Sequence, residues 1–247
     1  MGKLWDKIRG IRDKRRPFCT AIVAAAGRSE RMKGENKILM DLLGTPVLVW
    51  TLHALDRSDL VDEIIVATRE DLLLAVADLC SRAALKKPVR VVKGGESRMA
   101  SVLAAAVEAD PRTELIAVHD GARPLIRPEM IDELIRQGES TYAVAPAVPV
   151  SDTIKMTDGN GCVTSTPDRK SLFSVQTPQV FQASILKAAL QSALDAGVEL
   201  TDDCAAVERL GKEVYLTAGD PENIKLTTPL DLVIASAILE QRGREGV

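Results

Sequence analysis

The residues best suited to chemistry lie near the start of the chain, where an apolar run ends in small residues and two cations follow. The run Cys19–Ala26 leads into Gly27, and Arg31 and Lys37 come next. Small residues let a backbone approach a bulky ligand, and successive N–H groups in such a turn suit a phosphate. The cations can neutralise phosphate charge that the backbone cannot. The pattern predicts a nucleoside triphosphate site, although an ordinary strand-to-helix turn with surface cations has the same residue types.

Further polar clusters follow predicted strands, and ligands of open α/β sheets bind beyond the carboxyl ends of strands. Gly-Gly-Glu-Ser-Arg comes soon after Val92, and His-Asp-Gly-Ala-Arg-Pro follows Val118. Asp120 could contact a ribose hydroxyl or a metal, and Arg123 could bind phosphate. Each cluster alone is also compatible with a turn and a helix cap. Taken with similar clusters at 152–155, 168–169, 176–179, 201–203 and 222–227, they favour one shared site.

Alternating strand and helix patterns place these clusters. Strands are predicted at Cys19–Ala25, Glu63–Thr68, Val89–Val92, Leu115–His119, Tyr142–Val148 and Val214–Thr217. Helices are predicted at Pro46–Asp56, Leu72–Ala84, Arg98–Ala109, Glu129–Gln137, Ser184–Ala196, Asp203–Leu210 and Pro229–Gln241. Thr228, Pro229 and Asp231 mark the start of the last helix. The alternation predicts an α/β fold with a mostly parallel sheet and helices on both faces.

One segment interrupts the alternation. The β-type runs Ser151–Met156 and Cys162–Thr166 flank a Gly-rich turn, and its Asp158-Gly159 pair is a strong hairpin signal. A hairpin with no place in the parallel sheet is expected to project as an arm. Because an isolated two-stranded hairpin is marginal in water, the arm is predicted to pack against a second subunit.

Composition narrows the class of protein. The 247 residues form one domain over 18–241, which includes the arm over 148–171, with a basic extension over 1–17 and a tail over 242–247. A net charge of −3 and 3% aromatic residues argue against a nucleic-acid partner, and no apolar run is long enough for a membrane span. Two histidines and four dispersed cysteines exclude the usual zinc sites. Cys19 and Cys80 fit core thiols in a reducing cytoplasm.

The ordered motifs carry a resemblance. Ala-Ala-Gly…Arg-Met…Lys, Gly-Gly-Glu-x-Arg-x-x-Ser, His-Asp-Gly-Ala-Arg-Pro, Asp-Thr-Ile-Lys, Asp-Arg, Gln-Thr-Pro-Gln, Thr-Asp-Asp and Asn-Ile-Lys-Leu-Thr occur in that order over about residues 18 to 241. The set resembles the 2-C-methyl-D-erythritol 4-phosphate cytidylyltransferases of non-mevalonate isoprenoid synthesis. The resemblance implies a Rossmann-like nucleotidyltransferase fold and a homodimer joined through the hairpin arm. It also implies CTP as co-substrate, a divalent cation (usually Mg²⁺), and pyrophosphate as the leaving group.

The resemblance also implies roles for individual residues. Arg31 and Lys37 match cations around the α-phosphate, and Arg169 and Lys225 match cations that position the acceptor. Arg123, Thr153 and Thr177 match residues of the substrate site. Residues expected around the nucleotide are Ala25, Ala26, Gly27, Gly95, Glu96, Ser101 and Asp120. The metal ligands stay open, with Asp120 as one possibility and the CTP phosphates as the other.

Two alternative functions remain open from the sequence. A ribitol-5-phosphate cytidylyltransferase would share the fold, CTP and most of these motifs. A nucleotide-sensing binding protein without turnover is the other, because Ser29 stands where the family usually has a glycine. Pyrophosphate release with each acceptor separates the three functions.

Overall fold

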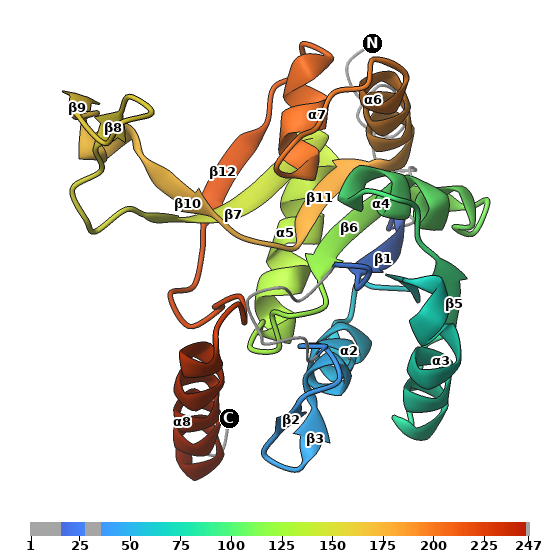
Figure 1. The fold of residues 1–247 in the computed structure, drawn as a ribbon. Coiled ribbons are helices and arrows are strands. Elements are labelled where there is room, and N and C mark those ends of the chain that lie inside the picture. Colours follow the sequence, from blue (N-terminus) through green and yellow to red (C-terminus); the bar gives the residue numbers. More distant parts are fainter. Residues whose placement is uncertain (1–15, 28–35, 246–247) are drawn as a thin grey trace, which may run out of the picture.

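The computed structural model describes residues 16–27 and 36–245, and it is built on one mixed eight-stranded sheet (Figure 1). The order is β10-β7-β11-β6-β1-β4-β5, and β12 pairs with β7 beside this path. The strands are β1 (Phe18–Ala24), β4 (Glu63–Thr68), β5 (Val89–Lys93), β6 (Thr113–Asp120), β7 (Ala143–Pro149), β10 (Phe173–Val175), β11 (Gln179–Gln182) and β12 (Tyr215–Ala218). The strands expected from the sequence are all present, most within two residues of the predicted bounds.

The main parallel part of the sheet consists of β5, β4, β1 and β6, and β7 and β12 form a second parallel pair. Its central strands are continuous apolar runs, as expected for strands buried on both faces. In the register of these strands, Ala24 of β1 lies opposite Ala67 of β4 and Asp120 of β6. The carboxyl ends of three strands therefore meet at one edge of the sheet.

Helices cover both faces, which confirms the predicted architecture. The helices are α2 (Val47–Arg57), α3 (Leu73–Arg82), α4 (Arg98–Val107), α5 (Pro128–Thr141), α6 (Ala183–Asp195), α7 (Asp203–Arg209) and α8 (Pro229–Glu245). Alternate residues of β1 point to opposite faces: Ala21 and Val23 pack in the core of α2, α3 and α5, and Ile22 packs in that of α4, α6 and α7. Within the described residues, no helix is both long and apolar enough to cross a membrane.

Several stretches differ from the predicted elements, and α5 is one of them, because it continues beyond the predicted Gln137 to Thr141. The short strands β10 and β11 pair antiparallel with β7, and β11 separates β7 from β6. The sequence indicated only an extended, turn-prone segment there, because each strand is short and Pro178 lies between them. The last helix also continues beyond Gln241 to Glu245. Arg242 stabilises this extension by donating hydrogen bonds to the carbonyl of Leu125 and to Glu222.

A hairpin projects beyond β10 and β7, at the end of the sheet opposite β5 (Figure 1). Its strands β8 (Met156–Thr157) and β9 (Val163–Ser165) pair only with each other and are shorter than predicted. Asp158 closes the turn by accepting hydrogen bonds from the N–H groups of residues 160 and 162, and Gly161 adopts a φ of 85°. A second small hairpin, β2 (Asp41–Leu42) with β3 (Thr45–Pro46), precedes α2.

Candidate functional site

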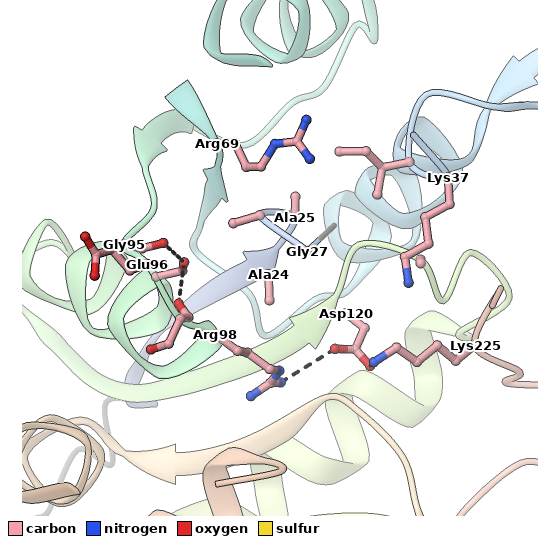
Figure 2. A pocket seen from close by; sticks show the side chains of 15 residues that line it. Ala24, Ala25, Gly27, Lys37, Arg69, Gly95, Glu96, Arg98, Asp120 and Lys225 are labelled. Carbon is pink, nitrogen blue, oxygen red and sulfur yellow. Dashed lines mark hydrogen bonds and ion pairs between the residues drawn. The ribbon is translucent and has the colours of Figure 1, made fainter. Parts of the chain in front are cut away.

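A pocket of about 330 Å³ lies at the edge where β1, β4 and β6 end (Figure 2). Residues from six separate stretches of the chain line it, and they include the first small-residue loop and the predicted clusters around Gly95, Asp120 and Lys225. The predicted clusters at 152–155, 168–169, 176–179 and 201–203 contribute no residue to this lining. The lining residues are Ala24, Ala25, Ala26, Gly27, Lys37, Ile38, Arg69, Gly95, Glu96, Ser97, Arg98, Ser101, Asp120, Ala122 and Lys225.

Two loops of small residues form one wall of the pocket. The first follows β1, where the N–H of Ala25 donates to the carbonyl of Ala67 at 2.8 Å. The second precedes α4 and packs so closely that a Cβ added to Gly95 would lie 2.5 Å from the Cβ of Ala100. Ser101 fixes this loop by donating its hydroxyl to the carbonyls of Ser97 (2.8 Å) and Gly95 (3.3 Å). The wall therefore presents backbone groups that a flat ring and its sugar can approach closely.

Positive side chains from four elements face the other side of the pocket. Lys37, Arg69, Arg98 and Lys225 line it, and Figure 2 shows them around one central space. Arg69 is bound by Asp71, with its Nη2 2.7 Å from Oδ2 of that carboxylate. The arrangement suits a ligand with several negative charges, because cations beside a partly enclosed site attract an anion more strongly than exposed cations do.

Asp120 is the acidic group at the centre of these cations. Its carboxylate lies 3.0 Å from Nζ of Lys225, 3.3 Å from Nε of Arg123 and 3.6 Å from Nη2 of Arg98. Burial opposes ionisation of this side chain, but the attraction of Lys225, Arg98 and Arg123 outweighs it and lowers the pKa of the carboxyl. Asp120 is therefore ionised at neutral pH and orders the cations around it.

A buried hydrogen-bond chain holds Asp120 from behind. The hydroxyl of Thr177 accepts from the N–H of Asp120 at 3.0 Å and donates to Nδ1 of His119 at 2.9 Å. The Nε2–H of His119 then donates to the carbonyl of Arg123 at 3.2 Å. Burial lowers the pKa of His119 to about 4, so its ring is neutral at neutral pH. Thr177 and His119 shape the end of β6 and do not line the pocket.

The pocket contains most of the predicted site residues. Those that line it are Ala25, Ala26, Gly27, Lys37, Gly95, Glu96, Ser101, Asp120 and Lys225. Arg123 lies behind Asp120 and donates to the carbonyl of Asn223 at 2.7 Å. Arg31 lies outside the described residues.

The structure places two predicted residues on the arm. Arg169 begins a short 3₁₀ turn, η3 (Arg169–Ser171), and donates to the carbonyl of Ser151 at 2.7 Å. Thr153 is exposed on the same arm. Neither lines the pocket of its own protomer, and the arm extends away from that edge of the sheet (Figure 1).

Two lining cations were not assigned from the sequence. Arg98 lies inside the Gly-Gly-Glu-Ser-Arg motif, but the functional interpretation of this segment relied on its glycines and on Ser101. Arg69 directly follows β4, so the rule that indicates Asp120 after β6 indicates it equally. Among residues 16–27 and 36–245, no three His, Cys, Asp or Glu side chains are placed to hold a metal ion.

The chain is similar to proteins of known family along most of its length. The family model described as 2-C-methyl-D-erythritol 4-phosphate cytidylyltransferase matches residues 19–241. The proteins of that name from Caldanaerobacter subterraneus and Synechocystis are 42% and 37% identical over 224 and 222 residues, which is 90% of this chain and 99% and 96% of those proteins. The 4-diphosphocytidyl-2C-methyl-D-erythritol synthase structure from Anaerococcus prevotii superposes with a TM-score of 0.81 at 30% identity, covering 91% of this chain and 96% of that one. The Thermus thermophilus cytidylyltransferase gives a TM-score of 0.72 at 28% identity, with coverage of 90% and 99%.

Proposed function

The chain belongs to the family of 2-C-methyl-D-erythritol 4-phosphate cytidylyltransferases, and we propose that the pocket at the ends of β1, β4 and β6 is its active site. The enzyme transfers CMP from CTP to 2-C-methyl-D-erythritol 4-phosphate and releases pyrophosphate. The product, 4-diphosphocytidyl-2-C-methyl-D-erythritol, is an intermediate of isoprenoid synthesis. One observation carries the assignment of the site: Lys37 and Lys225, from opposite ends of the chain, line the same cavity as the small-residue loops.

The nucleophile in this reaction needs no catalytic base. A phosphate monoester has a second pKa of about 6 and is already ionised at neutral pH. The neutral, buried ring of His119 is accordingly not required for proton transfer. The barrier comes from bringing two anions together and from the charge that gathers on the five-coordinate phosphorus. Lys37 and Lys225 supply the opposing positive charge, and the family resemblance assigns the same role to Arg31.

The nucleotide occupies the wall of small residues. Ala25, Ala26 and Gly27 approach the sugar and phosphates, while Gly95, Glu96 and Ser101 surround the base. The loop around Gly95 leaves no space for a side chain, so its backbone groups are accessible to a pyrimidine edge. A purine in the same place would meet α4, which begins at Arg98.

The acceptor lies between this pocket and the arm of a second protomer. Lys225 holds its phosphate side from one protomer, with Arg123 as a supporting cation behind Asp120. Arg169 and Thr153 complete the site from the other protomer. The support is the exposed apolar surface of the arm and of the adjacent strand β10, where Met156, Val163 and Phe173 are 55%, 53% and 45% exposed. Apolar side chains at such exposure are covered when two copies associate. The active enzyme is therefore a homodimer joined through the arms.

A magnesium ion fits this donor set only when the triphosphate supplies most of the ligands. Asp120 is the protein carboxylate that would hold it, and three cations already surround that side chain. Bound in this way, magnesium would neutralise part of the triphosphate charge, as is usual where a protein offers one or two carboxylates. The protein's own cations align the phosphates for in-line attack.

The compartment is the cytoplasm. All four cysteines are free thiols, and burial raises the pKa of Cys19 and Cys204, which keeps both protonated and unreactive. Such thiols are compatible with reducing conditions.

The experiment is a pyrophosphate-release assay with CTP, magnesium and a panel of acceptors. Release with 2-C-methyl-D-erythritol 4-phosphate, and little with ribitol 5-phosphate or with no acceptor, supports the proposal. Equal or faster release with ribitol 5-phosphate contradicts the acceptor. Tight CTP binding by calorimetry without release under any acceptor contradicts turnover.

A further inference from the structure

A carboxylate outside the pocket holds one of its cations. Asp203, the first residue of α7, is fully buried, and its Oδ2 accepts from Nη1 of Arg98 at 2.5 Å. Its other oxygen, Oδ1, has no hydrogen-bond partner within the described residues. Arg98 is the first residue of α4, so the pair joins the starts of two helices on one face of the sheet. None of the roles given above uses Asp203.

Arg98 connects Asp203 to the pocket, because it also pairs with Asp120. While one terminal nitrogen binds Asp203, Nη2 lies 3.6 Å from Oδ1 of Asp120 (Figure 2 shows this second contact). The other oxygen of Asp120 binds Nζ of Lys225 at 3.0 Å. A planar guanidinium with several N–H groups can span two carboxylates in this way, whereas an ammonium group acts as a single point charge. A continuous series of ion pairs therefore connects the protein interior with Lys225.

The main chain around Asp203 is tightly fixed. Gln179, buried on β11, donates from Nε2 to Asp202 at 2.8 Å and accepts from the N–H of Cys204 at 3.2 Å. Asp202 also caps α7 by accepting from the N–H of Ala205 at 3.0 Å. The residues on both sides of Asp203 are thus tied to the central sheet. This anchoring gives the carboxylate a defined place from which to hold Arg98.

A buried ion pair of this kind adds little to the free energy of unfolding, because the desolvation of the two charges often cancels their attraction. Burial raises the pKa of Asp203 in spite of Arg98, which shows that the carboxylate is costly to ionise here. We propose that Asp203 is a positioning residue for CMP transfer: it keeps Arg98 between two carboxylates, so that Asp120 remains shared with Lys225. Without Asp203, Arg98 moves fully onto Asp120 and displaces Lys225. The inference rests on the proposed function of the pocket.

The test compares kcat and KM of the wild type with Asp203→Asn, Arg98→Lys and the double variant. For Asp203→Asn, kcat is expected to fall on the order of 10- to 100-fold, the scale for misplacing a group near the reaction. The KM for CTP is expected to change by less than about threefold, because the loops around the nucleotide are intact. The double variant should be no slower than the slower single variant, since both changes break the same link.

The matched control is Asp132→Asn. Asp132 is also a buried carboxylate, bound by Ser58 and by the N–H of Leu60, which precede the amino end of β4 away from the pocket. Its variant should lose stability but keep kcat. The inference is contradicted if Asp203→Asn, assayed below its unfolding temperature, keeps the wild-type kcat. It is also contradicted if the effects of the two single variants on kcat multiply in the double variant. If Asp203→Asn does not fold, a wild-type kcat for Arg98→Lys contradicts it instead.

A crystal structure of Asp203→Asn gives a readout that does not depend on activity. Arg98 is expected to bind Asp120 directly, with Lys225 moved away from that carboxylate. Unchanged positions of both cations overturn the positioning role. By contrast, a wild-type protein that releases no pyrophosphate contradicts the proposed function while this structural test of Asp203 still stands.

Discussion

The pocket edge and the hairpin arm both carry predicted site residues, but the chain supports them differently. At the pocket edge, Asp120 is 6% exposed and is held by three cations and by the hydrogen bond that its N–H donates to Thr177. On the arm, the residues of β8 and β9 are all exposed and pair only with each other. One part of the site is thus fixed when a single protomer folds. The arm residues that we propose for the site lie on this exposed hairpin, and the described part of the chain shows no packing that fixes them relative to the pocket.

The two regions differ because the strands at the pocket edge are buried in the sheet, whereas the backbone of the arm is exposed. The carboxyl ends of β1, β4 and β6 converge because their strands lie in one sheet covered on both faces, so several loops must meet there. The arm has too few residues to bury a core, and two short strands are marginal in water. We propose that a second protomer supplies the missing contacts.

The largest expected effect is the loss of a pocket cation. Lys37→Ala and Lys225→Ala should each lower kcat on the order of 100- to 1,000-fold, because each removes a preorganised charge beside the reacting phosphates of CTP and the acceptor. Steady-state pyrophosphate release measures this effect. Lys212→Ala, at an exposed residue outside the pocket lining, is the control and should keep the wild-type rate. Near-wild-type kcat in both pocket variants would contradict the proposal that this pocket is the active site.

The next effect is on the free energy of unfolding, and it tests whether His119 is buried away from water behind the pocket. His119 has a pKa of about 4 in the fold, below its usual 6.5, so the fold favours the neutral ring. This contribution is complete above pH 6.5 and is lost as the pH falls through 4. At 1.36 kcal/mol per pH unit, it amounts to about 3 kcal/mol. Urea unfolding at pH 7 and pH 4 measures the loss. His119→Gln should lack this part of the pH dependence, and an unchanged dependence in that variant contradicts burial of a neutral ring.

A smaller effect is expected from the arm. Arg169→Ala should lower kcat/KM for the sugar phosphate about 30-fold and leave CTP binding unchanged, because the arm contributes only to the acceptor side. Calorimetry with CTP and kinetics with varied acceptor separate the two effects. Lys170→Ala, at the neighbouring exposed arm residue, is the matched control. Loss of CTP binding with intact use of the acceptor would mean that the two subsites are reversed.

The smallest effect concerns the stability of one protomer. Val163→Thr on β9 should change the free energy of unfolding by less than about 0.5 kcal/mol, since the side chain is 53% exposed. Phe181→Ala, in the core beneath α6, should cost about 3–5 kcal/mol. Val163→Thr should instead shift the monomer–dimer equilibrium towards monomers in sedimentation. A large loss of protomer stability from Val163→Thr would show that the arm packs within its own chain.

The comparison also explains what the sequence could predict. The β4 strand occupies Glu63–Thr68 as predicted, because a continuous apolar run bounded by polar residues has one favourable burial. Asp120 was found because it follows such a strand. By contrast, β10 and β11 owe their strand form to pairing with β6 and β7, and no local pattern of three or four residues contains that information. The Arg98–Asp203 pair joins residues that are far apart in sequence, so only the folded chain shows it.

We propose that the pocket edge of one protomer and the arm of another form a single catalytic unit. Mixing Lys37→Ala and Arg169→Ala subunits tests it directly, because the two defects then lie on different chains. After equal mixing and exchange, half of the dimers are mixed, and each has one intact site, so activity should return to about a quarter of the wild-type value. If exchange is verified and the mixture stays as inactive as its components, each protomer works alone and the claim is wrong.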